Sequence, residues 1–271
     1  MTTRPAFTDA LGRPFQVSSP PQRIVSLVPS LTEALFAFGL GQRVAGVTRY
    51  CVEPADGVAG KPKIGGTKNV DIAAVKALEA DLVLANVEEN TREDVERLEA
   101  AGLRVFLTYA RTVAEAITEL RTIAAIAGAE AEARPIVDEA EHELTRADAA
   151  ARSRAAVRTF CPIWRNPWMT IGPQTYIHDV LRVCGAANVY GDVPDRYPLV
   201  DLAEVAARRP EIVLLPDEPY RFAEKHVPEV IEKLGDVRIH LVDGKMLCWY
   251  GPRIAESLRR LQAVIRGEDG M

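Results

Sequence analysis

The chain has 271 residues and a net charge of −5, with 48% hydrophobic and 26% charged residues. This length can bury a core in one large or two small domains, and the balance is typical of a globular chain. The acidic charge argues against nucleic acid as a partner, and no apolar run reaches membrane-spanning length. The four cysteines are widely spaced without a C-x-x-C pair, so they predict buried thiols rather than a zinc site or disulfide framework.

The N-terminal part predicts two short strands followed by a buried one. Residues 1–9 lack the apolar core of an export signal. The sequence as written therefore predicts a cytoplasmic protein, or a periplasmic or cell-surface one if a signal has been removed. Asp9–Arg13 predicts a turn between two edge strands. The buried strand Ile24–Val28 leads into Ser30 and Glu33, whose spacing fits a capping box with Ser30 as the helix N-cap.

A stretch of the first half recurs in the second half. Asp71 and Asp201 each precede a short helical pattern and a buried strand pattern. The strand residues Val83 and Val213 are separated by the same interval as the two aspartates. A second helix and strand follow in both halves. Units of this kind resemble each other by chance, but the long shared register favours an internal duplication.

The segment between the two halves predicts one long helix. From Ala133 to Ala151, apolar residues recur at spacings of three and four, with acids at the beginning and arginines at the end. Residues 129–154 would span roughly 39 Å as a helix. The predicted fold class is α/β: two Rossmann-like lobes with parallel-type sheets, residues 1–127 and 157–271, joined by a connecting backbone helix over residues 128–156.

Three loops stand out by composition. The two glycines of 65–69 allow close backbone approach to a ligand, although a plain surface loop fits equally. The Pro-rich loop 164–169 holds two of the three tryptophans, which predicts a stacking platform for a flat ligand; the alternative is a loop folded onto its own tryptophans. Asp243-Gly244 predicts a hairpin turn.

The segment Arg23–Glu33, together with the long helix and the duplicated unit, resembles the substrate-binding proteins of iron-chelate and cobalamin ABC importers, the helical-backbone metal receptors. The resemblance extends over about residues 8–265. Gly46–Cys51, Val183–Gly185 and Trp249–Arg253 resemble the cobalamin-binding branch. The resemblance implies two α/β lobes joined by a rigid helix, with the ligand in the inter-lobe cleft and little lobe movement on binding.

The resemblance also implies an ABC transporter permease as partner and an exported or anchored protein. Members of the family carry one glutamate per lobe for docking on the transporter, two residues into the helices that begin at Asp71 and Asp201. Here these positions are Ala73 and Ala203, so the docking acids are replaced.

Ligands of α/β lobes bind outside the carboxyl ends of the strands, which selects the candidate site residues. The predicted ligand-binding residues are Ser30, Tyr50, Cys51, Thr67, Lys68, Asn69, Glu88 and Asn90 in the first lobe, and Trp164, Arg165, Trp168, Tyr197, Glu218, Tyr220, Trp249, Tyr250 and Arg253 in the second. Aromatic residues mixed with donors and both charge signs suit a large ring-like ligand. A cobalamin-like corrinoid, heme or a ferric chelate fits, bound without a covalent link.

Direct metal ligation and catalysis are weaker interpretations. His226 is the histidine expected to reach the rim, and Cys51, Cys248 or His226 could approach an axial position, although buried or unligated residues of these types are commoner. Glu88 and Glu218 could exchange protons in a chelatase. A cytoplasmic metal-cofactor chaperone or sensor would use the same cleft. No catalytic residue is predicted.

Overall fold

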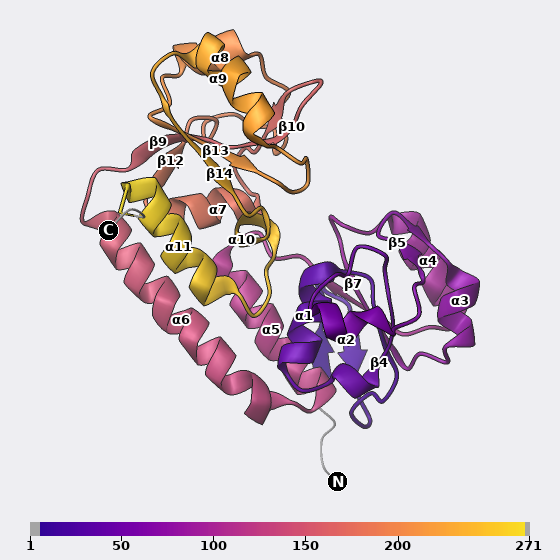
Figure 1. Cartoon of the computed structure of the whole chain (residues 1–271). Coiled ribbons are helices and arrows are strands. Elements are labelled where there is room, and N and C mark those ends of the chain that lie inside the picture. Colours follow the sequence, from indigo (N-terminus) through magenta and orange to yellow (C-terminus); the bar gives the residue numbers. More distant parts are fainter. Residues whose placement is uncertain (1–5, 269–271) are drawn as a thin grey trace. The chain divides into compact units, whose positions relative to one another are not determined.

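The computed structural model describes residues 6–268, which divide into two compact units (Figure 1). Unit 1 comprises residues 6–110, 116–138 and 250–252, and unit 2 comprises residues 111–115, 139–249 and 253–268. The first five residues, on which the expectation about export partly rests, lie outside the described residues. None of the described helices has the length and apolar character needed to cross a membrane.

Unit 1 is built on a four-stranded parallel sheet with the strand order β4-β3-β7-β8. The two central strands are buried at every position, as in parallel sheets covered on both faces. Its strands are β3 (Ile24–Ser26), β4 (Val44–Val47), β7 (Leu82–Asn86) and β8 (Val105–Thr108), with the ribbon β5 (Gly65–Gly66) and β6 (Asn69–Val70). Its helices include α1 (Pro29–Ala37), η1 (Gly41–Arg43), α2 (Ala55–Ala59), α3 (Ile72–Ala77) and α4 (Arg92–Ala100).

Unit 2 repeats this design with the parallel strand order β12-β9-β13-β14. Its strands are β9 (Val157–Phe160), β12 (Ala186–Asn188), β13 (Ile212–Pro216) and β14 (Arg238–Val242), with the ribbon β10 (Pro162–Trp164) and β11 (Met169–Thr170). Its helices include α7 (Tyr176–Val183), α8 (Leu202–Ala207), η2 (Glu224–His226), α9 (Val227–Leu234), α10 (Lys245–Cys248) and α11 (Ile254–Arg266). The predicted α/β class with parallel sheets in two lobes is confirmed.

The duplication is visible residue by residue. One constant shift in numbering converts both bounds of α3 into those of α8, and both bounds of β7 into those of β13. The capping aspartates behave as predicted: Asp71 accepts the Ala74 N–H at 2.9 Å, and Asp201 accepts the Ala203 N–H at 2.7 Å. In unit 1, α3 packs against α4, and in unit 2 α8 packs against α9 (Figure 1). Both the sheet order and its helical cover are therefore shared.

An N-terminal hairpin covers one edge of the unit 1 sheet. The strands β1 (Ala6–Thr8) and β2 (Pro14–Gln16) pair antiparallel, as the predicted turn requires. The Ala10 N–H donates to the Leu107 carbonyl at 2.9 Å, and Phe15 packs edge-on against Phe106 at 5.3 Å. Because β8 is the edge strand, these contacts shield backbone groups that would otherwise face solvent.

Two long helices belong partly to each unit. Helix α6 (Glu130–Arg152) is the predicted connecting helix, with Pro135 inside its first turns. Its residues 130–138 count with unit 1 and the remainder with unit 2, whereas the sequence treats 128–156 as a separate segment. The preceding helix α5 (Val113–Ala127) is shared between the units in the same way and is not among the predicted elements.

Two local predictions are wrong. Helix α1 begins at Pro29 with Val28 as its N-cap, and no side chain caps it, so Ser30 and Glu33 do not form a capping box. Proline suits the first helical position because its φ is already helical, which moves the helix start ahead of Ser30. Asp243 does not make a hairpin turn: its carboxylate accepts the Lys245 N–H at 3.0 Å as the chain enters α10.

Candidate ligand-binding surfaces

An aromatic cluster lies beyond the strands of unit 2. It consists of Trp164, Trp168, Tyr220, Phe222 and His226, contributed by the ribbon β10–β11, the segment after β13 and η2. The Trp164 and Tyr220 rings meet edge-on at 5.6 Å, Tyr220 lies 4.7 Å from Phe222, and Trp168 stacks on Phe222 at 5.6 Å. The rings support one another, and Trp164 is the exposed member of the cluster.

The two tryptophans of this cluster have different environments. Trp164 is 45% exposed and offers part of its ring to solvent. Trp168 packs against the hydrophobic core of unit 2, which includes Phe160 and Leu215. Trp168 is thus folded onto the protein, as the alternative interpretation of the loop 164–169 expects, whereas Trp164 keeps an exposed face. That this face stacks on a flat ligand stays a prediction.

His226 supports the cluster from inside. Its side chain is buried, and Nδ1 accepts the Ala223 N–H at 2.9 Å, which assigns the proton of the neutral ring to Nε2. Nε2 lies 3.5 Å from the Tyr220 hydroxyl. Burial, with Lys225 and Arg165 nearby, lowers the pKa of His226. The expectation that His226 reaches the rim is therefore wrong, because its two nitrogens face protein groups.

A second group of predicted residues surrounds Glu218. The Trp249 indole N–H donates to the Glu218 carboxylate at 3.2 Å, and burial raises the pKa of Glu218. Trp249 is buried, with the charged ends of Lys245 and Arg253 lying 5.2 Å and 5.1 Å from its ring. Cys248, a candidate axial ligand, donates its thiol to the Gly244 carbonyl at 3.1 Å. These side chains contact one another and do not form an exposed ligand-binding surface.

Two more predicted residues of unit 2 lie at its surface. Arg165 is half-buried and forms an ion pair with Glu229 at 2.8 Å. Tyr197 is 40% exposed, with the Arg196 guanidinium 5.4 Å from its ring centroid. Tyr197 therefore presents an aromatic face as Trp164 does.

The corresponding surface of unit 1 is mainly polar. Tyr50 is 55% exposed, and the Arg49 guanidinium lies 5.9 Å from its ring. Thr67, Lys68 and Asn69 follow Gly66 at the turn between β5 and β6, with Lys68 and Asn69 exposed. The Lys68 ammonium donates to the Glu88 carbonyl, so the two predicted residues meet through the backbone of the loop after β7.

Asn86 and Asn90 shape that loop. The Asn90 side chain accepts the Asn86 N–H and donates to the Thr67 carbonyl, both at 2.9 Å. The Asn86 side chain accepts the Glu88 N–H at 2.8 Å. Both amides are buried, so Asn90 organises the loop instead of lining an open surface. Asn86 was not predicted; its amide type at a strand end is the signal that could have identified it.

Three further predicted residues of unit 1 are buried. The Cys51 sulfur lies 3.1 Å from the Thr32 hydroxyl and 3.2 Å from that of Thr48, and burial raises the pKa of the thiol. Ser30 is buried at the start of α1. Tyr250, which the sequence assigns to the second lobe, counts with unit 1 and donates to the Glu89 carboxylate at 2.7 Å. Since the thiol is enclosed by hydroxyl groups, Cys51 does not present itself to an axial position. Among the described residues, no group of three or more His, Cys, Asp or Glu could hold a metal ion.

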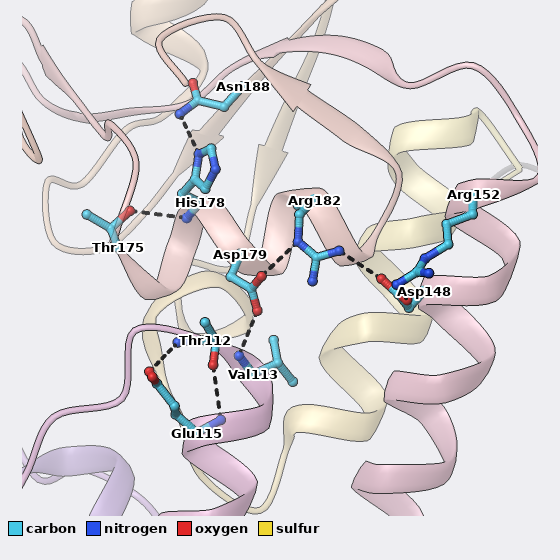
Figure 2. Close-up of polar contacts among 10 residues, drawn as sticks. All are labelled: Thr112, Val113, Glu115, Asp148, Arg152, Thr175, His178, Asp179, Arg182 and Asn188. Atoms are coloured by element: carbon cyan, nitrogen blue, oxygen red, sulfur yellow. Dashed lines mark hydrogen bonds and ion pairs between the residues drawn. The ribbon is translucent and has the colours of Figure 1, made fainter. Parts of the chain in front are cut away.

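Unit 2 also has a cavity of about 530 Å³ lined by residues of α6 and α7 and of the beginning of α5 with the residue before it. Arg182 donates to Asp179 at 2.9 Å and to Asp148 at 2.8 Å, and Arg152 pairs with Asp148 at 2.7 Å (Figure 2). Asp179 accepts the Val113 N–H at 2.9 Å, at the first residue of α5. Each acid pairs with an arginine, so this network fastens three helices together.

The two α/β units, each with a loop surface beyond the carboxyl ends of its strands, define the class of substrate-binding proteins built from two lobes. The family model described as periplasmic binding protein matches residues 24–233, and the chain belongs to this family. It is thus a substrate-binding protein of the ABC-importer type, for which a small molecule and an ABC transporter are the general partners.

Particular relatives agree with this family. The vitamin B12-binding protein of Vibrio parahaemolyticus is 24% identical over 197 residues, covering 72% of this chain and 71% of that protein. The structure of the periplasmic vitamin B12 binding protein BtuF of Vibrio cholerae matches with a TM-score of 0.79 at 18% identity, covering 93% of this chain and 99% of that one. A periplasmic heme binding protein from Pseudomonas aeruginosa matches with a TM-score of 0.78 at 23% identity, covering 90% and 92%.

Proposed function

We propose that this protein binds a corrinoid of the cobalamin type, or another metal chelate such as heme or a ferric chelate, without a covalent link and without catalysing a reaction. The observation that carries the proposal is the exposed Trp164 ring, braced by Tyr220 in the aromatic cluster. A macrocycle presents a flat apolar face, which aromatic side chains bind well. Relatives named as vitamin B12-binding and heme-binding proteins support this ligand class.

We divide the predicted site residues by their role. Residues that present an accessible face contact the ligand, and residues that are buried or packed around Trp249 position them. The proposed contact residues are Tyr50, Thr67, Lys68, Asn69 and Glu88 in unit 1, and Trp164, Arg165, Tyr197 and Tyr220 in unit 2. The proposed positioning residues are Ser30, Cys51, Asn90, Trp168, Glu218, Trp249, Tyr250 and Arg253. That the ligand lies in an inter-lobe cleft stays a prediction from the family resemblance.

The polar loop of unit 1 suits the rim of such a ligand. Corrinoids carry amides and hemes carry carboxylates around the ring. The Lys68 ammonium and the Asn69 amide are exposed donors at one turn, and Thr67 adds a hydroxyl. We infer that unit 2 supplies most of the apolar contact and unit 1 most of the hydrogen bonds.

The docking partner is proposed to be an ABC transporter permease, as in the family. The positions of the family's docking glutamates, Ala73 on α3 and Ala203 on α8, are exposed here. Docking at these positions would thus proceed without the two carboxylates. Cell fractionation tests whether this protein shares the periplasmic location of its family.

Titration of the purified protein with cyanocobalamin, heme and a ferric chelate, followed by tryptophan fluorescence, tests the ligand class. We expect quenching by at least one of them, and roughly tenfold weaker binding in Trp164→Ala, because a central aromatic anchor contributes about 1 to 2 kcal/mol or more. Tyr190→Phe, a buried tyrosine of unit 2, is the matched control. An unchanged affinity in Trp164→Ala would refute the contact assignment, and metal insertion into an added porphyrin would favour a chelatase.

A further inference from the structure

Two adjacent residues donate hydrogen bonds to carboxylates that belong to different units. The Trp249 indole N–H donates to Glu218 at 3.2 Å, and the Tyr250 hydroxyl donates to Glu89 at 2.7 Å. Trp249 and Glu218 count with unit 2, and Tyr250 and Glu89 count with unit 1. The chain therefore passes from one unit to the other at the peptide bond that joins these two donors.

The two acceptors lie in matching loops of the duplicated fold. Glu89 lies in the loop after β7, and Glu218 lies in the segment after β13, the strand that corresponds to β7 in the second half. Both segments hold residues proposed to contact the ligand, namely Glu88 in unit 1 and Tyr220 in unit 2. One dipeptide thus reaches equivalent loops of both halves of the duplication.

Both donors are fixed in position. Trp249 and Tyr250 are buried, and charge-assisted hydrogen bonds are stronger where water is excluded. Glycines allow close packing on either side: a Cβ at Gly244 would lie 2.6 Å from the Glu218 carbonyl oxygen, and one at Gly251 would lie 2.9 Å from that of Ser30. The backbone on either side of the two donors is therefore closely packed, with little room for either donor to move alone.

We propose that Trp249 and Tyr250 form a clip that links the order of the loop 86–90 to that of the segment 216–222. The two side chains share one short backbone. Releasing either carboxylate lets that backbone move, and the other donor then loses its fixed position. The consequence for ligand binding rests on the function proposed above: the clip holds in place the loop that carries Glu88 in unit 1 and the segment that carries Tyr220 in unit 2. Trp249 and Tyr250 act as positioning residues.

Amide hydrogen exchange in the ligand-free protein tests the clip directly. In Tyr250→Phe, which removes the hydroxyl and keeps the ring, we expect roughly tenfold faster exchange in residues 86–90, as loss of a hydrogen bond to a charged group predicts. The decisive readout is the segment 216–222, where exchange should also rise, by about threefold. In Trp249→Phe the larger effect should move to 216–222 and the smaller one to 86–90. Tyr190→Phe is the matched control and should change neither segment.

A second variant covers the case in which Tyr250→Phe fails to fold. Glu89→Ala removes the acceptor of unit 1 and leaves the buried aromatic residues intact, so exchange in 216–222 should rise as well. Effects confined to the loop nearest each substitution, in all variants that fold, would overturn the clip.

A ligand arm separates this proposal from the proposed function. With cyanocobalamin, heme and a ferric chelate as probes, Tyr250→Phe should weaken the binding of whichever probe binds the unmodified protein by about tenfold. If none of the three probes binds, the proposed ligand class fails, and the exchange experiment still decides the clip. If a probe binds and Tyr250→Phe leaves its affinity unchanged, the positioning role is refuted while the function stands.

Discussion

The two units share a scaffold and differ in their loops. Strand order, the capping aspartates and the lengths of α3–β7 and α8–β13 recur in the same register. Beyond the strands, unit 2 presents an aromatic cluster, whereas unit 1 presents a polar turn and a loop organised by Asn86 and Asn90. The two units therefore share the elements that fold the chain and differ in the loops beyond their strands, where function-bearing differences between related folds usually lie.

The sheet edges differ as well. In unit 1 the N-terminal hairpin hydrogen-bonds to β8 through Ala10 and Leu107. In unit 2 the corresponding edge strand is β14, on which Leu241 is 39% exposed. The hairpin has no counterpart before β9, because α6 leads into that strand instead.

The largest expected loss of stability comes from a substitution that disrupts a loop of unit 2 and leaves unit 1 unchanged. A Cβ at Gly172 would lie 1.9 Å from the Asp195 carbonyl oxygen, so Gly172→Ala must displace the segment that carries Tyr197. We expect a loss of about 3 kcal/mol in the free energy of unfolding. Gly60→Ala in unit 1, where a Cβ would meet no atom within 4 Å, is the control and should change it by less than about 0.5 kcal/mol. Urea denaturation measures both, and equal losses would contradict the close approach.

The next prediction compares the stability losses of the two tryptophans in the aromatic cluster, the packed Trp168 and the exposed Trp164. Trp168→Ala removes a ring stacked on Phe222 and packed on the core, so we expect a loss of about 2 kcal/mol in stability. Trp164→Ala should cost less than about 1 kcal/mol, because that ring is 45% exposed. Thermal and urea unfolding of both variants measure the difference. A larger loss in Trp164→Ala would reverse the roles assigned to the two tryptophans.

A smaller effect tests how closely the duplicated elements correspond. Asp71→Ala and Asp201→Ala each remove a helix N-cap whose carboxylate accepts a backbone N–H. We expect losses of about 1 kcal/mol in both, since both caps are exposed and each satisfies one backbone donor. Chemical denaturation of the two single variants provides the comparison. A loss in one variant alone would show that the duplicated helices no longer contribute equally.

Local signals account for what the sequence predicted well. The capping aspartates and the apolar strands β7 and β13 depend on residues close to them in the sequence, so the sequence pattern predicts them. The sequence also selects the exposed aromatic residues Tyr50, Trp164 and Tyr197, because it places them outside the carboxyl ends of predicted strands. What these residues bind follows from family resemblance rather than from the pattern.

Long-range packing accounts for the misses. Ser30 looked like a cap, but Pro29 takes the first helical position and turns Ser30 into the interior. The burial of Cys51 depends on Thr32 and Thr48, and that of His226 depends on Tyr220 and Phe222. Residue type and strand position do not specify which side chains these residues meet. The sequence therefore locates the loops, whereas the burial and partners of each side chain are visible only in the structure.

The smallest expected effect concerns Glu218, the residue of unit 2 that matches Glu88. Burial raises the pKa of Glu218, so folding disfavours its ionised form relative to the unfolded chain. The resulting stability is present below the pKa of an unfolded glutamate, about 4.3, and is lost as the pH rises through the folded value. Glu218→Gln keeps an acceptor for Trp249 without the charge. It should therefore be slightly more stable than the unmodified protein at neutral pH, and the difference should vanish below about pH 4.

Urea denaturation across this pH range measures the Glu218 effect. If Glu218→Gln is less stable at neutral pH, the ionised carboxylate gains more from Trp249 and Lys245 than it loses by burial. The expected gain has a functional meaning. A buried carboxylate that costs stability is retained for what it positions, and Glu218 holds Trp249 beside the segment that carries Tyr220. If Glu218→Gln is more stable but binds the ligand less tightly, the carboxylate of Glu218 lowers stability and contributes to ligand binding by unit 2.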